Sequence, residues 1–208
     1  MFKEMSLEAF ADATASREPV PGGGSVSALA GGLAASLTAM VATLTFTKEA
    51  FADRAPEMRR LHDAAEGLRK ELLDAADRDA QSYRDVLAAY RQPKTTEEER
   101  GQRTAAIQAA FRHATEVPLQ IAEAAIRVLE LAATATRRGN PDMLTDAGVG
   151  VVLARSAALG ALMNAKFNLA SLKDNAFVAQ ARDRIERLRQ RAMQMESEVL
   201  ASLGSGEN

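Results

Sequence analysis

Residues 19–47 read PVPGGGSVSALAGGLAASLTAMVATLTFT and contain no charged side chain. A stretch of this length is long enough to cross a bilayer. Its many glycine, serine and threonine residues dilute the few large apolar side chains, which argues against a membrane span. Small residues instead let neighbouring helices approach closely. We therefore expect the part that follows Ser25 to form a buried central helix.

The helical period continues along the chain after this stretch. Apolar or small residues recur at steps of three and four from Pro56, which predicts one long helix ending near Pro93. Thr96 followed by Glu99 is typical of a capping box, and the helix that it starts is expected to run to Gly139.

Two further helices are expected in the C-terminal half, and a break or kink is expected before them at Pro118. Residues 139–141 read Gly-Asn-Pro and predict a turn, after which residues 146–172 form a mostly apolar helix. Asp174 is expected to cap a last amphipathic helix. Its predicted inward residues are Phe177, Ala181, Leu188, Ala192, Met195 and Val199. Its arginines are expected on a solvated face: Arg182, Arg184, Arg187, Arg189 and Arg191.

The composition favours the same fold class. Hydrophobic residues make up 47% of the 208 residues, whereas aromatic residues make up only 4%, a balance that suits packed helices better than sheets. We predict an all-α protein, an up-down helical bundle of about six helices with long central helices. Residues 1–208 are expected to form a single domain whose last residues, 204–208, fray. The two most apolar helices are too apolar for a small monomer, so a homodimer is expected.

Charge and residue usage exclude several kinds of function. The 26 basic and 28 acidic residues give a net charge of -2, so nucleic acid is not expected as a partner. A membrane is not expected either, because of the small and polar residues in the uncharged stretch. Cysteine is absent, which excludes disulfides and thiol nucleophiles and suits a reducing compartment. With only two histidines, far apart, no metal site is expected. The charged first ten residues do not resemble an export signal, so we expect a cytoplasmic protein.

A glycine-rich loop opens directly into the uncharged helix: Pro21, Gly22, Gly23, Gly24 and Ser25. Its backbone amides can bind an anion or a carbonyl oxygen at the start of a helix. No Lys-Ser/Thr pair follows at the spacing of a P-loop, and no strand precedes it as in a dinucleotide fingerprint. The alternative interpretation is a tight turn followed by close helix packing.

Asp79 is an acidic residue in an apolar row. Ala65, Leu72, Asp79 and Val86 are spaced by seven residues and share one line of a helix, with Tyr83 one turn beyond Asp79. Burial raises the pKa of a carboxyl group and a nearby cation lowers it. Asp79 is therefore neutralised, paired with a basic residue or kept for a ligand. A salt bridge to an arginine across the bundle is the structural alternative.

Several other polar residues are candidates for a site. Asn164 and Asn168 lie one turn apart on an apolar helix, where amides hydrogen-bond either a heterocycle or a backbone group. Asp146 reads as a helix cap. Lys94 and Lys48 are cations that either meet an anionic substrate or only increase solubility.

These residues fall in seven short motifs whose order and spacing resemble those of a known family. They are Pro19 to Ser25, Asp79-Ala80 with Tyr83, Pro93-Lys94-Thr95, Ala114 to Leu119, Gly139-Asn140, Asp146 to Val149, and Asn164 with Asn168. Together they resemble the C-terminal family of formiminotransferase-cyclodeaminase, and within it the stand-alone bacterial methenyltetrahydrofolate cyclohydrolases.

The resemblance implies an all-helical, dimeric, cytoplasmic folate enzyme that uses neither a metal nor a cofactor. It assigns catalytic work to the aspartate of an Asp-Ala-x-x-aromatic motif, here Asp79, which we expect Tyr83 to orient. The residues expected to bind substrate are Pro21, Gly22, Gly23, Gly24, Ser25, Lys48, Lys94, Asn140, Asp146, Asn164 and Asn168. Lys94 and Lys48 are expected to neutralise the glutamate carboxylates of the folate.

The expected reaction is hydrolysis of methenyltetrahydrofolate to formyltetrahydrofolate by general acid/base catalysis. The same scaffold can instead serve cyclodeamination of formimidoyltetrahydrofolate with release of ammonia. A folate-binding or scaffolding protein without activity is the alternative of another class. That alternative requires the inner polar residues to satisfy one another, leaving no cleft lined by Asp79 and the glycine loop.

Overall fold

The computed structural model describes residues 1–204, and every regular element within that range is a helix. The six α-helices are α1 (Leu7–Thr14), α2 (Gly23–Phe46), α3 (Ala55–Tyr90), α4 (Glu97–Arg138), α5 (Leu144–Asn168) and α6 (Asn175–Gly204). Short 3-10 turns cover Phe2–Glu4, Glu49–Phe51, Pro141–Met143 and Leu169–Ser171. The predicted all-α class is confirmed. Residues 205–208 of the expected frayed tail lie outside the described residues, and Gly204 is the last residue of α6.

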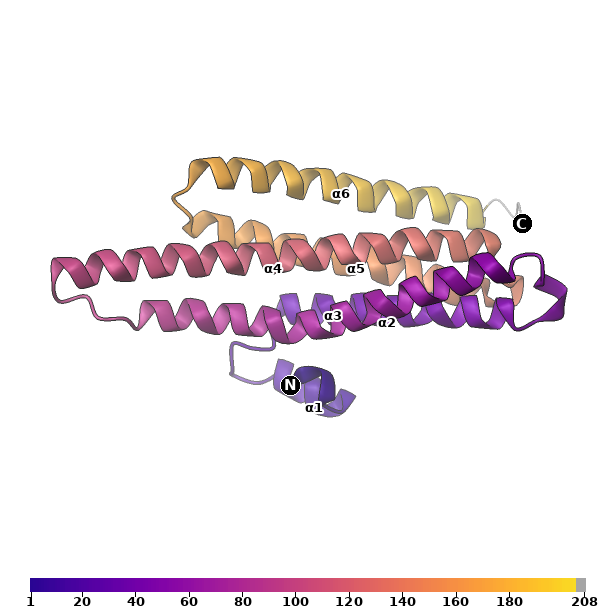
Figure 1. Ribbon diagram of the computed structural model, residues 1–208, viewed down its shortest axis with the longest axis horizontal. Coiled ribbons are helices and arrows are strands. Elements are labelled where there is room, and N and C mark those ends of the chain that lie inside the picture. Colours follow the sequence, from indigo (N-terminus) through magenta and orange to yellow (C-terminus); the bar gives the residue numbers. More distant parts are fainter. Residues whose placement is uncertain (205–208) are drawn as a thin grey trace.

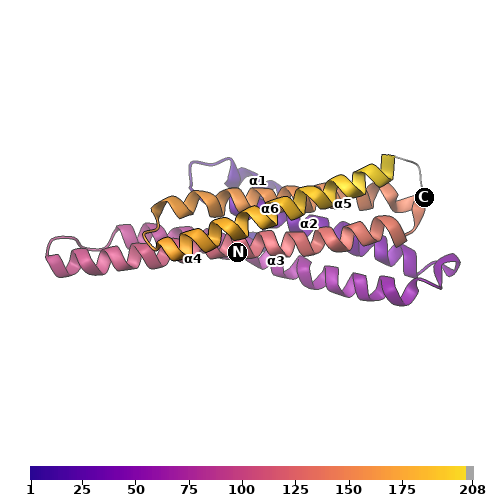
Figure 2. The same ribbon diagram turned by 90° about the horizontal axis from the view of Figure 1, so that it is seen from above.

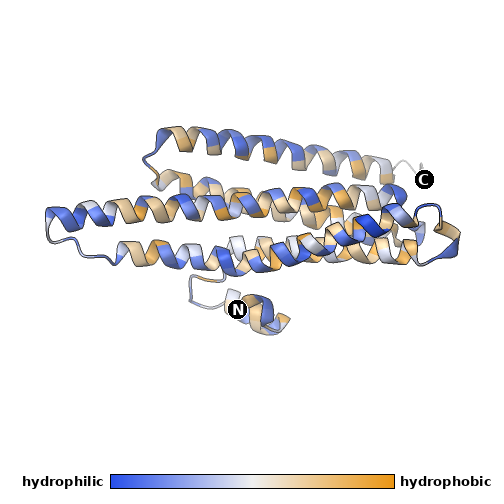
Figure 3. Cartoon of the chain, viewed as in Figure 1, coloured by the Kyte–Doolittle hydropathy of each residue, from blue (hydrophilic) through white to orange (hydrophobic). Residues whose placement is uncertain are grey.

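Helices α2 to α5 run up and down beside one another and form the central bundle (Figure 1). Helix α6 packs outside this bundle against α4 and α5, and Figure 2 shows it crossing over them. The short helix α1 lies on the other side, beside α2 and α3 (Figure 1). Polar and apolar residues alternate along α4 and α6, as expected for helices with one solvated face (Figure 3). The predicted up-down bundle with long central helices is therefore confirmed.

Helix α2 is in close contact with its neighbours, as its small residues predicted. A β-carbon on Gly31 would lie 3.2 Å from Leu72 Cδ1 and 3.4 Å from Ala157 Cβ. A β-carbon on Gly150 would lie 3.6 Å from the carbonyl oxygen of Ala34. Because these positions carry no larger side chain, α3 and α5 approach the backbone of α2 from two sides.

Two helical stretches, Gly23–Phe46 and Pro141–Ser171, are long and apolar enough to cross a bilayer by length and composition. In this fold, 50% and 44% of their most apolar windows are buried against other helices. The core helices of soluble proteins pass the same test, so the property is weak evidence for a membrane protein.

The long helices begin and end close to the predicted positions. Helix α3 covers Ala55–Tyr90, within a few residues of the prediction. At the start of α4, Thr96 Oγ1 accepts a hydrogen bond from the backbone N–H of Glu99 at 3.2 Å. The carboxylate of Glu99 accepts one from the N–H of Thr96 at 3.0 Å, so the predicted capping box is confirmed.

The expected break at Pro118 is wrong, since α4 continues through this residue, whereas the kink that was the other expectation stays a prediction. Proline has no N–H, so the carbonyl oxygen of Ala114, four residues earlier, loses its helical partner. The side-chain amide of Asn168 donates a hydrogen bond to that oxygen at 2.6 Å. A residue of α5 thus replaces the missing backbone donor and stabilises the uninterrupted helix.

The start of α5 differs from the prediction, whereas the start of α6 agrees with it. Helix α5 begins at Leu144 with Met143 as its N-cap, which places Asp146 inside the first turn and not at the cap. Asp174 Oδ1 accepts a hydrogen bond from the N–H of Phe177 at 3.0 Å and caps α6 as predicted.

The faces of α6 are largely as predicted. The inward residues are buried, apart from Leu188, which is half-buried. Arg184 is half-buried on the outer face and forms ion pairs with Glu116 at 3.0 Å and Glu123 at 2.8 Å on α4. The other arginines of this face are exposed, and one of them, Arg191, also pairs with α4 through Glu130 at 3.3 Å.

Candidate active site

A cavity of about 600 Å³ lies where the N-terminus of α2 meets α3 and α5. Apolar and aromatic side chains form most of its wall, and a few polar groups converge on it, which is typical of a small-molecule site. Its lining comes from the residues before the glycine loop (Pro19, Val20), the glycine loop (Gly22, Gly23, Gly24), α3 (Asp79, Ser82, Tyr83, Val86, Leu87, Tyr90), α4 (Phe111, Ala114) and α5 with its extension (Met163, Asn164, Phe167, Asn168, Ser171).

The carboxyl group of Asp79 lies against the first turn of α2. The N-cap of α2 is Gly22, which has no side chain to satisfy the first amides of the helix. Asp79 does this from α3: its carboxyl group accepts hydrogen bonds from the backbone N–H and from the hydroxyl of Ser25, the latter at 3.0 Å. A β-carbon on Gly24 would overlap the carboxyl group, so only glycine fits at this position.

Two effects act on the protonation of Asp79 in opposite directions. Burial raises the pKa of this carboxyl group above its ordinary value. The hydroxyl and the N–H of Ser25 lower the pKa by stabilising the ionised form, but burial is the larger effect. No basic side chain in the described residues pairs with Asp79, so the expected alternative of an arginine salt bridge is wrong.

The two asparagines of α5 form the opposite wall. Asn164 donates its amide N–H to the carbonyl oxygen of Gly160 at 2.9 Å, and a β-carbon on Gly23 would lie 3.3 Å from its Nδ2 atom. Asn168 donates to Ala114, as described above, and lines the cavity as well. Both residues therefore have a structural hydrogen bond and a position at the cavity.

Tyr83 also lines the cavity, and its side chain is 43% exposed. Within the described residues, the group that contacts the Asp79 carboxyl is Ser25 and not the Tyr83 hydroxyl. The hydrogen bond to Asp79 thus comes from a residue of another helix, and the orienting role expected for Tyr83 stays a prediction.

The sequence did not point to the large apolar side chains of the wall. Tyr90 and Phe111 meet edge to face with ring centroids 6.2 Å apart. Met163 and Phe167 are 73% and 81% exposed, far more than core residues. Met163 and Phe167 lie one helical turn apart, each directly before one of the two asparagines. In an apolar helix this spacing is also typical of buried residues, so the sequence does not distinguish these exposed side chains from core residues.

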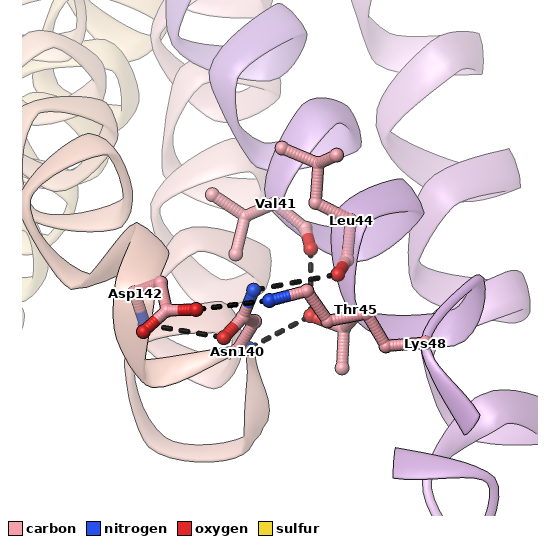
Figure 4. A network of polar contacts seen from close by, with 6 residues as sticks. All are labelled: Val41, Leu44, Thr45, Lys48, Asn140 and Asp142. Carbon is pink, nitrogen blue, oxygen red and sulfur yellow. Dashed lines mark hydrogen bonds and ion pairs between the residues drawn. The ribbon is translucent and has the colours of Figure 1, made fainter. Parts of the chain in front are cut away.

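Three of the predicted binding residues lie away from the cavity, at the other end of the bundle. Lys48 follows the C-terminal end of α2, and its ammonium forms an ion pair with Asp142 at 2.9 Å (Figure 4). Asn140 is buried beside it, and its N–H donates to Thr45 Oγ1 at 2.8 Å. Asp146 lies in the adjacent first turn of α5. The 24 residues of α2 separate its two ends by about 36 Å.

The remaining predicted residues lie near the cavity without lining it. Pro21 and Ser25, the two ends of the glycine loop, are buried and do not line the cavity. Lys94 is exposed in the connection between α3 and α4, four residues beyond Tyr90. The structure therefore brings together Asp79, Tyr83, the three glycines and both asparagines, and it leaves the two lysines outside.

The fold and the cavity define an all-helical protein with a carboxyl-centred candidate active site. Comparison with known proteins gives a consistent and more specific answer. The family model of formiminotransferase-cyclodeaminase matches residues 6–187. The chain belongs to this family.

Individual relatives support the same assignment. The chain is 34% identical over 183 residues to a methenyltetrahydrofolate cyclohydrolase of Methylorubrum extorquens, covering 88% of each chain. It is 34% identical over 200 residues to the formimidoyltransferase-cyclodeaminase of Rattus norvegicus, covering 96% of this chain but only 37% of that longer protein. Its fold is similar to the crystal structure of a formiminotetrahydrofolate cyclodeaminase from Thermotoga maritima. That match has a TM-score of 0.78 and 28% identity, and it covers 96% of this chain and all of the other.

Proposed function

We propose that this protein hydrolyses methenyltetrahydrofolate to formyltetrahydrofolate, with Asp79 as the general base and acid. The observation that supports this proposal is a carboxyl group at the wall of a cavity, without a basic partner. The methenyl bridge of the substrate is a nitrogen-carbon-nitrogen unit that carries a delocalised positive charge. An ionised carboxyl group beside it attracts that cation more strongly than it would in water, because the site is partly buried.

The chemistry needs one group that first accepts and then returns a proton. Asp79 accepts a proton from the attacking water while the oxygen of that water bonds to the bridge carbon. The resulting carbinolamine collapses to a formyl group on one nitrogen when the bond from carbon to the other nitrogen breaks. Asp79 returns its proton to the leaving nitrogen, and the hydroxyl proton of the carbinolamine goes to solvent. The net reaction consumes one water and releases one proton. Proton transfer by Asp79 therefore accounts for it without a cofactor.

The other residues of the cavity are proposed to bind the folate. Tyr90 and Phe111 offer ring faces or edges to the substrate rings, and Tyr83 lies one turn from Asp79 on the same wall. Asn164 and Asn168 each have one N–H engaged by a backbone carbonyl, which leaves their oxygens as acceptors for N–H groups of the ligand. We leave Lys48 out of this site, because it is at the far end of α2.

Cyclodeamination of formimidoyltetrahydrofolate is the second candidate, because two of the relatives are named cyclodeaminases. There a folate nitrogen attacks the formimino carbon and ammonia leaves, again with a proton taken and returned near one carbon. Purified protein is to be offered methenyltetrahydrofolate and formimidoyltetrahydrofolate separately, with methenyl absorbance and ammonia both recorded. Loss of absorbance from the first substrate alone supports hydrolysis. Ammonia from the second substrate supports the cyclodeaminase, and turnover of neither contradicts both proposals.

A matched pair of glycine variants tests whether the site lies at this cavity. A methyl group in Gly24→Ala would overlap the Asp79 carboxyl group, and we expect turnover to fall by about 100-fold. Gly67→Ala adds the same methyl on the exposed face of α3, where no atom lies within 4 Å of it. Turnover by Gly67→Ala is expected to equal that of the parent. Equal activity of both variants would remove the glycine loop from the site.

We further propose that the protein is a homodimer. Val26, Leu33 and Met40 share one line of α2, since they are spaced by seven residues, and each is at least 37% exposed. On the adjoining α5, Val152 and Phe167 are also exposed. An apolar face of this kind is typical of a subunit interface.

Light scattering of the purified protein tests the dimer. The parent is expected to have twice the mass of one chain, and a Leu33→Glu, Met40→Glu variant the mass of one. Leu200→Glu changes an exposed leucine of α6, a helix that packs against α4 and α5, and is expected to keep the mass of the parent. A parent of monomeric mass would contradict the proposal.

The proposed cellular setting is the cytoplasm, since the chain has no cysteine that an oxidising compartment would pair. The reaction as written transfers only protons and water, and so we propose that it uses no metal or organic cofactor. Turnover after prolonged dialysis against a chelator is expected to equal that of untreated protein, and a loss that zinc or magnesium restores would contradict this.

A further inference from the structure

Ser25 occupies a position where it acts on Asp79 without reaching the cavity. It is the third residue of α2, it is fully buried, and it is not among the residues that line the cavity. Its hydroxyl oxygen lies 3.0 Å from Asp79 Oδ2 and 2.9 Å from the carbonyl oxygen of Ala76. These two oxygens compete for one hydroxyl hydrogen.

Asp79 Oδ2 is the stronger of the two acceptors, and it can keep the Ser25 hydroxyl in both protonation states of Asp79. When Asp79 is ionised, the Ser25 hydroxyl donates to Oδ2, because a hydrogen bond to a charged acceptor is stronger than one to a carbonyl. When Asp79 carries the proton that it exchanges with the substrate, that proton is on Oδ1, the oxygen that accepts no hydrogen bond from the Ser25 hydroxyl, and Oδ2 still accepts from Ser25. The Ser25 hydroxyl therefore holds Oδ2 in both states, and no heavy atom needs to move.

We propose that Ser25 is a positioning residue that holds Asp79 in place both as a base and as an acid. This inference rests on the proposed function, in which one carboxyl group takes a proton from water and returns it within a turnover. Preorganised partners that need no rearrangement during the reaction lower the barrier. The backbone N–H of Ser25 also stabilises the ionised carboxyl group and so lowers the pKa of Asp79.

The surroundings of Asp79 make the effect of Ser25 measurable. The titratable side chains at the cavity other than Asp79 are Tyr83 and Tyr90, both from α3. The glycine loop, α4 and α5 contribute none to the wall. A change in the acidic limb of the activity profile therefore reports on Asp79.

The test is Ser25→Ala, assayed for kcat and KM on methenyltetrahydrofolate across pH. We expect kcat to fall on the order of 10- to 100-fold, as for groups that position a reacting partner, with KM within about twofold of the parent. The acidic limb is expected to move to higher pH, because the ionised carboxyl group loses a donor. The fall in kcat persists at pH values well above that limb, where a residue that only adjusted the pKa of Asp79 would have no effect.

Two further variants separate this role from a merely structural one. Ser25→Thr keeps a hydroxyl group at the same place and is expected to recover most of the lost kcat. Ser27→Ala removes another buried hydroxyl of α2, which donates to the carbonyl oxygen of Gly23 at 2.7 Å and does not contact Asp79. This control is expected to have the kcat, KM and pH profile of the parent.

Each outcome decides the matter. A Ser25→Ala variant with parental kcat above the acidic limb, or with a raised KM and parental kcat, overturns the inference while the proposed function stands. A parent that turns over neither folate overturns both. If Ser25→Ala does not fold by circular dichroism, Ser25→Cys takes its place, because a thiol is a weaker donor. Ser25→Cys is then expected to lose kcat, and parental kcat would overturn the inference.

Discussion

The two ends of α2 both carry buried polar groups, but they are built differently. At the C-terminal end, Thr45 Oγ1 donates to the carbonyl oxygen of Val41 at 2.7 Å and accepts from the N–H of Asn140 at 2.8 Å (Figure 4). Asn140 Oδ1 accepts from the N–H of Asp142, whose carboxylate pairs with Lys48. This network connects the end of α2 to the turn before α5, and none of it lines the cavity.

At the N-terminal end, by contrast, the polar network ends at a cavity. Asp79 is held by Ser25 on one side and faces about 600 Å³ of open space on the other. Burial raises the pKa of Asp79, whereas the ion pair with Lys48 lowers that of Asp142. Burial of polar groups therefore does not distinguish a candidate site from a structural network. A titratable group with incomplete protein partners beside a cavity is the distinguishing feature.

The largest expected effect belongs to the N-terminal end. Asp79→Asn keeps the size of the side chain but cannot exchange a proton, and we expect turnover of methenyltetrahydrofolate to fall by about 100-fold or more. Loss of methenyl absorbance measures it. Turnover within about tenfold of the parent would remove Asp79 from its proposed role.

The same variant makes an opposite prediction for stability. The pKa of Asp79 is higher in the folded protein than in the unfolded chain, so between these two values only the folded state is protonated. The contribution of this group to stability therefore falls as the pH rises through that window. Asp79→Asn removes the cost of a buried charge, and at pH 7 it is expected to unfold at a temperature equal to or above that of the parent. A lower unfolding temperature would mean that the charge stabilises α2 more than burial destabilises it.

At the C-terminal end we expect the converse, a loss of stability without a loss of activity. Thr45→Ala leaves the buried N–H of Asn140 without an acceptor, which costs about 1–3 kcal/mol. Chemical denaturation measures the loss, and turnover per folded molecule is expected to stay at the parental level. A large fall in turnover would show that the two ends of α2 are coupled.

A smaller effect is expected where α5 supports α4. Asn168→Ala leaves the carbonyl oxygen of Ala114 unpaired, which costs about 1 kcal/mol. Pro118→Ala provides the missing backbone N–H, so Asn168→Ala is expected to cost less in that background. The two single variants and the double variant form a thermodynamic cycle in urea. Additive effects would show that Asn168 does not compensate for the proline.

The smallest expected effect is an increase in stability. Gly67 lies on the exposed face of α3 with open space around its α-carbon, away from both ends of α2. Gly67→Ala is expected to stabilise the protein by about 0.5–1 kcal/mol, because alanine loses less conformational freedom in a helix. An increase in the thermal unfolding temperature measures it, and a decrease would contradict the open surroundings of this residue.

Much of the fold was predictable because helices are local structures. The capping box at Thr96, the turn before Pro141 and the cap at Asp174 each depend on residues a few positions apart. The break expected at Pro118 was wrong for a non-local reason, since its compensating donor, Asn168, is 50 residues away in the sequence. Asp146 was misassigned because α5 begins two residues earlier than its apolar pattern indicates.

The candidate site was predictable in its residue types and only partly in its members. The apolar row around Asp79 and the glycine loop both indicated special positions, and the structure places them together. Charge alone indicated the two lysines as substrate-binding residues, and charge does not specify which end of a bundle a residue occupies. Met163 and Phe167 were missed because exposure depends on whether another helix covers that face.

The helices, their order and the acidic residue on an apolar face were predictable from the amino-acid sequence, because these depend on spacing along one chain. The hydrogen bond of Asp79 to Ser25 and not to Tyr83, and the pairing of Lys48 with Asp142 at the opposite end, follow from the packing of the helices. Contacts of this kind depend on how far each helix is shifted and rotated against its neighbour. That arrangement follows from the packing of the whole core, including glycines that allow α2 to approach α3 and α5 closely.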